Sequence, residues 1–428
     1  MLSFGVMTLV DTLFVGRLGS AALAGVGLAG TATFALLCFS MGLLRGVKVL
    51  VSQSVGAGQR SELGAHLGAG LLLAVVLGVL TALVGCGLAQ LLPHLAASPA
   101  AGAHARTYLS IRVLGAPLVL AFVALREYRY GDGDMRSPMV AALIGNAVNI
   151  ALNYVMVVRL GWGVAGSAWS TVIGHVVELA VVVIAQARSG FPIAGMRWRH
   201  LAALWSVGVP TGLQFLLEMG SFALLTTIIS LLGEVEMAAH QITLQVIHFS
   251  FLPTIALGEA GSVLAGQAVG ANEDHLVRRI ARAGLLGAVV YTGLCTIAFV
   301  ALGVPIVSLF TDEPVLAGTA LALLRVGACF QIADGATVVA RGVLRGAGDV
   351  KVPAQLGVLC AWVFTPPLTW LLGRVAGLGA LGGWIGLSCE IVLLSILCWI
   401  RLERGLWTPL AVRSRARLRH EADLAVAA

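Results

Sequence analysis

The chain has 428 residues, of which 59% are hydrophobic and only 11% are charged, and its formal net charge is +7. An ordinary soluble domain is about one-quarter charged. The composition therefore excludes a soluble globular protein and indicates one that lies in a membrane.

Apolar stretches that could cross the roughly 30 Å hydrocarbon core recur along the whole chain. They predict an all-α, polytopic membrane protein with about twelve transmembrane helices. In chain order the predicted segments are Met1–Gly16, Ala22–Leu44, Leu63–Leu92, Thr107–Leu125, Pro138–Val158, Gly163–Ala187, Leu201–Leu232, Met237–Gly261, Ala281–Phe310, Leu316–Ala340, Val352–Leu372 and Leu378–Ile400.

The first segment is short. As a helix, Met1–Gly16 rises only about 24 Å, so we expect either a native start upstream of Met1 or a first helix that does not reach the cytoplasmic surface. A cleaved signal peptide is disfavoured, because no basic region precedes the segment and Asp11 lies within it.

Basic residues gather between alternate segments. If the loops after the even-numbered segments face the cytoplasm, these loops and the C-terminal tail hold 21 of the 27 Lys and Arg residues. The positive-inside rule then places both termini in the cytoplasm. The location that we expect is the plasma (inner) membrane. We expect the lipid bilayer as a partner and no nucleic acid. The six exceptions are Arg17, Arg106, Arg112, Arg159, Arg325 and Arg374.

The chain repeats itself at one nearly constant offset. "SQSVGAG" (Ser52–Gly58) returns 214 positions later as "GQAVGAN", and "RLGSAALA" (Arg17–Ala24) returns more faintly at the same offset as "LLGEVEMA". "GDGDMRSP" (Gly131–Pro138) returns 215 positions later as "GAGDVKVP". Three ordered matches indicate an internal duplication.

Six segments in each half return the chain to the side on which it began. The repeat is therefore parallel, with two pseudo-symmetric six-helix lobes that enclose a substrate cleft. We place the N-terminal lobe at residues 1–188, a cytoplasmic linker at 189–200, the C-terminal lobe at 201–400 and a basic cytoplasmic tail at 401–428.

Carboxyl groups inside apolar segments need an explanation, because a charge at the bilayer centre costs about 2.5–3.5 kcal/mol. Asp11, Glu218 and Asp334 have no basic residue one helical turn away that would neutralise them. Such a carboxyl group can take up a proton or ligate a hard cation. These three acids are therefore candidates for cation coupling.

Three further acids favour a structural interpretation. Glu178 follows His175 by three residues on one helical face, so the two can pair locally. Glu259 and Glu390 lie near segment ends or beside Gly and Ser, where water or backbone partners are available. The sequence leaves the roles of all three open.

Several quoted stretches together resemble the MATE (multidrug and toxic compound extrusion) transporters, and specifically their NorM-like branch. The likeness covers essentially the whole chain, in order and at matching segments. The stretches are "VDTLFVGRLGSAALAGVGLA" (Val10–Ala29), "QSVGAG", "NAVNIALNYVMV" (Asn146–Val157), "GVPTGLQFLLEMGSFAL" (Gly208–Leu224), "MAAHQITLQ" (Met237–Gln245) and "QIADGATVVARGVLRGAGD" (Gln331–Asp349).

This resemblance implies a secondary antiporter that exports organic cations or amphipathic drugs by alternating access. The coupling ion would be Na+ or H+, with no cofactor and no structural metal, and the protein would act as a monomer. The family's cation-coupling acids fall on Glu218 in the seventh segment and Asp334 in the tenth. The "VDT" aspartate of the family's first segment falls on Asp11.

The resemblance also implies an ion or substrate site in the N-terminal lobe. Some members have Asn-xxx-Asp on the fifth segment and Thr on the sixth. Here these positions hold Asn149, Asn153 and Thr171, so an amide replaces the second carboxylate. Phe330 stands one turn before Asp334, where NorM-like proteins often have tyrosine. Phe330 and Gln214 are candidates for the lining of the cleft.

Two alternative functions can be weighed against a drug transporter. An intramembrane aspartyl protease would need a mid-segment GxGD motif, but both copies of the pattern here precede a basic residue and a proline in loops. No HExxH motif, nucleophile elbow or P-loop occurs in the sequence, so we do not expect an enzyme. A lipid-linked oligosaccharide flippase of related fold is the alternative, but its cleft would carry cationic residues, whereas the charges within these segments are mostly acidic.

Overall fold

All regular elements in the computed structural model are helices over residues 2–96, 98–190 and 196–426, the ranges that the structure describes. The first half contains α1 (Leu2–Gly16), α2 (Ser20–Gly56), α3 (Leu63–Leu95), α4 (Pro99–Leu114), α5 (Ala116–Gly131), α6 (Arg136–Asn153) and α7 (Gly163–Ser189). The second half contains α8 (Trp198–Ser230), α9 (Glu234–Gly270), α10 (Asp274–Ala301), α11 (Gly303–Ser308), α12 (Pro314–Gly346), α13 (Lys351–Leu368), α14 (Ala380–Glu403) and α15 (Thr408–Val426). Three short helices are not α-helical. The 3-10 helix η1 (Arg60–Glu62) precedes α3, and the π-helical stretches η2 (Tyr154–Arg159) and η3 (Thr369–Val375) follow α6 and α13.

Most of these helices are long and apolar enough to cross a membrane. Within the described ranges, nine unbroken helical stretches meet this criterion, and two bent helix pairs bring the number to eleven. The remaining predicted segment corresponds to the shorter apolar helix Gly5–Gly16 of α1. The prediction of an all-α, multi-pass membrane protein is confirmed.

Two segments that the sequence analysis treated as single helices are bent. α4 and α5 meet at an angle of 48° around Gly115, and α4 begins at Pro99, eight residues before the predicted start of its segment. Pro117 lies in the first turn of α5 and has no backbone N–H to continue the hydrogen bonds of α4. α9 bends by 46° near Pro253, which removes a hydrogen bond in the same way.

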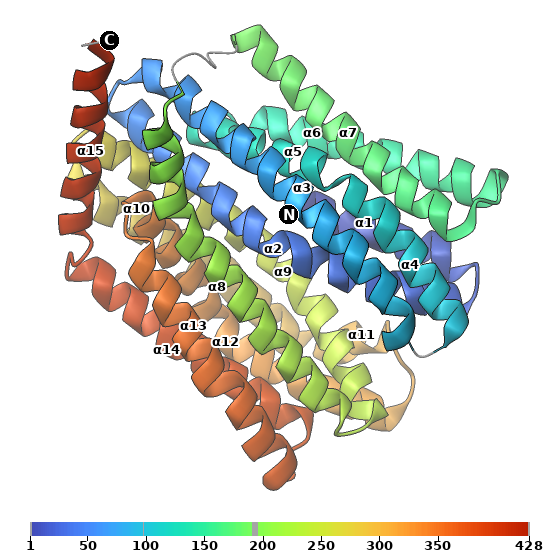
Figure 1. Cartoon of the computed structure of the whole chain (residues 1–428). Coiled ribbons are helices and arrows are strands. Elements are labelled where there is room, and N and C mark those ends of the chain that lie inside the picture. The colour runs from blue at the N-terminus through green and yellow to red at the C-terminus, as the bar shows by residue number, and fades with distance from the viewer. Residues whose placement is uncertain (1, 97, 191–195, 427–428) are drawn as a thin grey trace. The chain divides into compact units, whose positions relative to one another are not determined.

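The chain forms two compact units (Figure 1). Unit 1 contains residues 1–51 and 59–213, and unit 2 contains residues 52–58 and 214–428. Within unit 1, α3 packs against α4 and α5, and α6 packs against α7 and α1. Within unit 2, α12 packs against α9, α10 and α14. The division falls inside α8, whereas the lobe boundaries inferred from the sequence fall in the loop before it; those boundaries stay a prediction.

The backbone conformation repeats between the two halves. Every described residue with φ in the left-handed region has a counterpart 214 to 216 positions away that also has positive φ. The six pairs are Gly19 and Gly233, Gly58 and Asn272, Gly133 and Gly348, Gly161 and Gly377, Gly163 and Gly379, and Gly190 and Gly405. The π-helical stretches η2 and η3 begin 215 positions apart as well. The internal duplication is therefore present in the backbone.

The two copies of the GxGD motif form one kind of turn. The N–H of Asp134 donates to the carbonyl of Arg129 at 2.8 Å, and the N–H of Asp349 donates to the carbonyl of Leu344 at 2.9 Å. Each turn closes a long helix, α5 or α12, and leads directly into the next one. Both copies therefore lie in turns between helices, as their place in predicted loops indicated.

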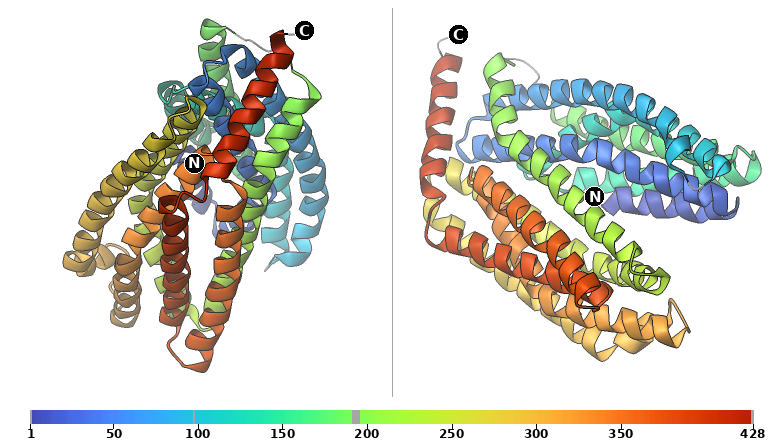
Figure 2. Two further views of the ribbon diagram at one scale, coloured as in Figure 1. Left: turned by 90° about the vertical axis from the view of Figure 1, so that its left-hand side faces the viewer. Right: turned by 60° about the horizontal axis from the view of Figure 1, so that its bottom comes forward.

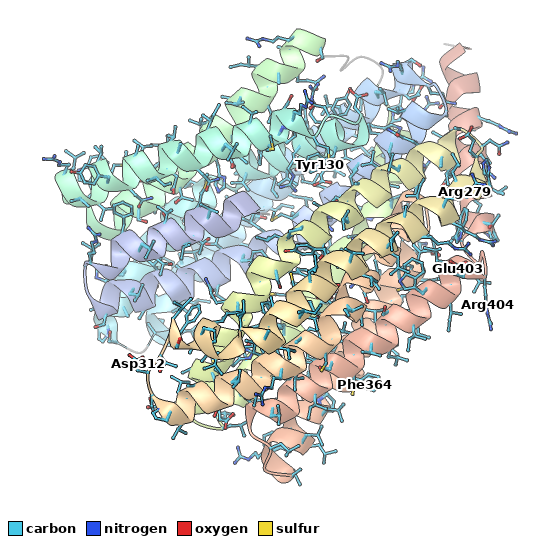
Figure 3. All side chains as sticks on the ribbon, turned by 180° about the vertical axis from the view of Figure 1, so that it is seen from behind. Tyr130, Arg279, Asp312, Phe364, Glu403 and Arg404 are labelled. Atoms are coloured by element: carbon cyan, nitrogen blue, oxygen red, sulfur yellow. The ribbon has the colours of Figure 1, made fainter. Side chains whose placement is uncertain are left out.

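Unit 2 ends in a helix beyond the predicted segments. α15 leaves α14 at a marked angle (Figure 2) and packs against the end of α9. Seen from behind (Figure 3), Arg279, Glu403 and Arg404 lie at one end of unit 2, and Asp312 lies at the other end. The start of α10 and the end of α14 therefore share one end of this unit.

Candidate functional site

Asp11 of α1 is the centre of a buried polar cluster in unit 1. Its side chain is 1% exposed and accepts three hydrogen bonds. The Tyr108 and Thr171 hydroxyls each donate to Oδ2 at 2.6 Å, and Nδ2 of Asn153 donates to Oδ1 at 2.9 Å. Three neutral donors on one carboxyl group suit its ionised form, because a protonated acid must itself donate.

The amides of α6 complete this cluster. Asn149 and Asn153 lie one turn apart on the same helical face and are fully buried. Nδ2 of Asn149 donates to Thr171 Oγ1 at 3.1 Å, and Nδ2 of Asn153 also reaches the Asn149 carbonyl. The Oδ1 atoms of both amides are buried and have no hydrogen-bond partner. Buried acceptors of this kind are normally satisfied, so these two oxygens are open to a cation.

The structure thus brings together the predicted residues Asp11, Asn149, Asn153 and Thr171. They come from α1, α6 and α7, and their positions span 160 residues of the chain. Carboxylate, amide and hydroxyl oxygens are the ligands that hard cations prefer. The cluster has the donor set to hold a small monovalent cation, or to take up a proton at the carboxylate.

Tyr108 is a member of this cluster that the sequence analysis missed. It lies on α4 and is 3% exposed. A single tyrosine in an apolar segment carries no motif or spacing that marks it. The one available signal is that a buried tyrosine hydroxyl needs a partner, and Asp11 is that partner.

Glu178 is paired as expected. Its Oε2 lies 2.8 Å from Nδ1 of His175, and both side chains are buried. Gly145 of α6 makes room for the glutamate, since a Cβ at that position would lie 2.3 Å from its Cγ. The predicted local pairing of these two residues is confirmed.

Glu218 of α8 belongs to unit 2 and forms an ion pair. Nη2 of Arg341, on α12, lies 2.7 Å from its Oε1. The expectation that Glu218 has no neutralising partner is wrong. No basic residue lies one turn away on the same helix, and the partner is 123 positions away, at a position that the hydropathy pattern places in a loop. Its helix, α12, extends to Gly346 and carries Arg341 inside the unit.

Gln214 supports the same ion pair. Its Nε2 donates to Glu218 Oε1 at 2.9 Å, and its Oε1 accepts from Nη2 of Arg345 at 3.1 Å. Gln214 is 1% exposed. In this structure it orients the glutamate and is buried; its role as a cleft-lining residue stays a prediction.

Two more acids lie near the Glu218 ion pair. Asp334 of α12 is half-buried and within electrostatic range of Arg341 and Glu218. Glu390 of α14, for which a structural role was favoured, lies within electrostatic range of all three. The Thr365 hydroxyl donates to Glu390. Unit 2 therefore gathers three carboxyl groups around one arginine.

Phe330 is buried in the apolar core of unit 2. Its ring packs against Trp384 of α14, with 6.1 Å between ring centroids. Nε1 of Trp384 in turn donates to Nδ1 of His240 at 3.1 Å. An aromatic core contact is the observed environment of Phe330, and its role in a cleft stays a prediction.

These clusters of buried carboxyl groups occur in a chain whose sequence matches one known family. A family model described as MatE matches residues 1–155 and 210–371. The chain belongs to the MatE family. The resemblance inferred from the sequence is thereby confirmed. Members of this family are transporters, and MatE membership agrees with the expectation that the chain is not an enzyme.

Curated relatives of this MatE chain match over most of its length. Three of them are called probable multidrug resistance protein NorM. The protein from Pseudomonas putida is 30% identical over 93% of this chain and 91% of its own length. Those from Pseudomonas syringae pv. tomato and Bradyrhizobium diazoefficiens are 31% and 32% identical, over 91% and 89% of this chain and 89% and 85% of their own lengths.

Solved MatE-type structures share the fold. The eukaryotic MATE transporter AtDTX14 matches with a TM-score of 0.88 at 18% identity, over 97% of this chain and 95% of that one. A multidrug resistance MATE family transporter in an outward-facing conformation matches with a TM-score of 0.87 at 20% identity, over 95% and 93%. The two-lobe helical fold expected from the sequence is confirmed.

Proposed function

We propose that this MatE transporter is a secondary antiporter that exports cationic or amphipathic drugs in exchange for Na+ or H+. The observation that carries the proposal is the environment of Asp11, a buried carboxyl group that accepts hydrogen bonds from three neutral donors. A buried ionised carboxylate needs a counter-charge, and a bound coupling ion would supply it. The names of the curated relatives support drugs as the cargo.

The ion site in the N-terminal lobe consists of Asp11, Asn149, Asn153 and Thr171. The two unsatisfied amide oxygens would complete the coordination of Na+. If the coupling ion is H+, the proton resides on Asp11 and the amides serve as acceptors. In either case, binding and release of one positive charge changes the electrostatics of the lobe.

The second site consists of Glu218 and Asp334 in the C-terminal lobe. Both carboxyl groups lie on helices that pack in unit 2, and their proximity to each other supports a shared role. Two cations in one buried site repel each other. Cationic cargo and coupling ion would therefore occupy this site in turn. Alternation between them gives antiport by alternating access.

The placement in the membrane follows from charge. The distribution of basic residues supports cytoplasmic termini, and the bacterial relatives support a location in the inner membrane. The lobes would be residues 1–188 and 201–400, joined by a cytoplasmic linker, and the protein would act as a monomer. Small-molecule organic cations and the surrounding lipid are the partners in this proposal.

Dye uptake into inverted membrane vesicles tests the proposal, with Na+ or H+ gradients imposed separately. We expect accumulation of a cationic dye when the coupling ion is concentrated in the lumen, and none without a gradient. Asp11→Asn, Glu218→Gln and Asp334→Asn should abolish gradient-driven uptake, because an amide cannot titrate and is a poorer ligand for a cation. Undiminished uptake by all three variants, inserted at wild-type levels, would refute the assignment.

A further inference from the structure

Arg341 provides an internal positive charge next to a proposed cation-binding acid. We propose that Arg341 occupies Glu218 in place of the cargo, and that a cationic ligand must displace it, so that Arg341 sets the affinity and charge selectivity of the site. This inference rests on the proposed role of Glu218 in cation binding. It adds a specificity-determining residue to that site.

The ion pair is well enclosed. The side chains of Arg341 and Glu218 are 15% and 26% exposed, and Nη2 lies 2.7 Å from Oε1. Gln214 donates to the same carboxylate oxygen. A Cβ at Gly357 of α13 would lie 2.3 Å from Glu218 Oε1 and 3.0 Å from Arg341 Nη2. The absence of a side chain at Gly357 therefore gives the pair the space that it occupies.

Two other carboxyl groups lie within electrostatic range of Arg341. Asp334 lies seven residues earlier on α12, and a seven-residue step returns to the same helical face within about 20°. Glu390 of α14 is also within electrostatic range of Arg341. When Arg341 leaves Glu218, its guanidinium still lies in the electrostatic field of two other carboxyl groups. These carboxyl groups lower the cost of releasing Glu218 to a cationic ligand, because the guanidinium keeps negative charge nearby.

Arg341 competes with a cationic ligand for Glu218 at every ordinary pH. The guanidinium group stays protonated under all ordinary conditions, so a change of pH does not remove it from Glu218. Any cationic cargo must exchange with it. Loss of the arginine charge would leave the glutamate available, and would favour ligands with a fixed positive charge over neutral ligands of similar size.

Equilibrium binding to purified protein in detergent tests this inference. The probes are ethidium, which has a fixed positive charge, and Nile red, which is neutral. For Arg341→Gln we expect ethidium affinity to rise about tenfold or more, because Glu218 then has no internal cation that competes with the ligand. Nile red binding should not change. Arg282→Gln is the matched control, because its bond to Glu403 lies on the exposed surface of the same unit.

Two further variants guard against a folding defect. Arg341→Lys keeps the charge on a shorter, more strongly hydrated side chain, and should give an intermediate gain in ethidium affinity. Glu218→Gln/Arg341→Gln removes both charges, and the gain should disappear. Unchanged or weaker ethidium binding by Arg341→Gln and Arg341→Lys would overturn the inference. If the wild-type protein and every variant bind no ethidium, the proposed cation site itself is wrong.

Discussion

Gly56, the last residue of α2, touches the backbone of Gln267 in α9. A Cβ at Gly56 would lie 2.0 Å from the Gln267 carbonyl oxygen. The reciprocal contact also exists, since a Cβ at Gly270 would lie 2.1 Å from the Gln53 carbonyl oxygen. Each glycine and each glutamine lies 214 positions from its counterpart. The two copies of the repeat motif therefore cross each other, and each supplies the glycine that the other requires.

The first prediction concerns this crossing. Gly56→Ala and Gly270→Ala should each destabilise the folded protein by about 1–3 kcal/mol, because the new methyl group overlaps backbone atoms that cannot move independently. Thermal unfolding of the purified protein in detergent measures the effect. Gly87→Ala is the control, since a Cβ there meets nothing within 4 Å and alanine favours the helix α3. Equal losses in all three variants would contradict the reading of a close crossing.

The second prediction tests the amide oxygens of the Asp11 cluster. Asn149→Ala and Asn153→Ala should raise the concentration of coupling ion needed for half-maximal export by about tenfold or more, as expected when groups that hold or orient ion ligands are lost. Dye uptake by vesicles at graded Na+ or H+ concentrations gives this value. Asn146→Ala is the control. Asn146 lies one turn earlier on α6, and its amide donates to the Ala142 carbonyl of the same helix. Its half-maximal concentration should stay near that of the wild type.

The third prediction concerns Tyr108. Tyr108→Phe removes a hydroxyl that donates to Asp11 at 2.6 Å. Hydrogen bonds to charged groups contribute about 1.5–3 kcal/mol, and unfolding in detergent should show a loss of this order. In the Asp11→Asn background the same change should cost less, because the hydroxyl then meets a neutral amide. A cost that is independent of Asp11 would show that the hydroxyl matters for another reason.

The sequence was sufficient for the fold but not for the tertiary partners within it. Apolar length predicted the spanning helices, and the repeat predicted the duplicated turns. The bend at Gly115 was missed because Pro117 lies in an otherwise continuous apolar stretch. α15 was described only as a basic tail, although its Ala411 and Leu418 are buried and Ala411 belongs to the apolar core of unit 2.

The same distinction applies to the candidate sites. Asp11 could be named because acids are rare in apolar segments, and Asn149 and Thr171 could be named because of the resemblance to the MATE family. Tyr108 and Arg341 could not be assigned, because their roles depend on contacts 97 and 123 positions away. Such distances in sequence are fixed by helix packing, which hydrophobic periodicity does not specify.

The fourth prediction concerns the pH dependence of the turn after α5. Burial raises the pKa of the Asp134 carboxyl group, but hydrogen bonds from Ser137 and Arg129 outweigh it and lower the pKa below its ordinary value. A lowered pKa in the folded state stabilises the protein above the unfolded pKa of about 4, and this contribution is lost as the pH falls through the folded value. Asp134→Asn should therefore lower the melting temperature between pH 5 and 8, and the difference from wild type should shrink under more acidic conditions.

Asp132 is the control for this experiment. Burial raises the pKa of its carboxyl group, so the ionised form is disfavoured by folding and its contribution has the opposite sign. Asp132→Asn should not lower the melting temperature between pH 5 and 8. A loss for Asp132→Asn equal to that for Asp134→Asn would mean that the hydrogen bonds that Ser137 and Arg129 donate to the Asp134 carboxylate are not the cause.

The last prediction concerns the hydrogen bond between α15 and the end of α2. Nη2 of Arg417 donates to Gln53 Oε1 at 2.9 Å, while Gln53 Nε2 donates to the Gly346 carbonyl at 2.9 Å. α15 is itself fastened by the ion pair of Arg415 with Asp274. Loss of the Arg417 contact should loosen the crossing of α2 and α9, because one of the bonds that orient Gln53 is gone.

Cysteine accessibility measures this loosening. Ser52 is fully buried at the crossing, so Ser52→Cys, in a background without the native cysteines, should react slowly with a water-soluble maleimide. Arg417→Gln should accelerate the reaction several-fold, since modification requires local opening and its rate follows the population of the open form. Arg419→Gln is the matched control on the exposed face of the same helix. Similar rates for Arg417→Gln and Arg419→Gln would mean that α15 does not hold the crossing closed, whereas a rate increase confined to Arg417→Gln identifies this one hydrogen bond as the link between the C-terminal helix and α2.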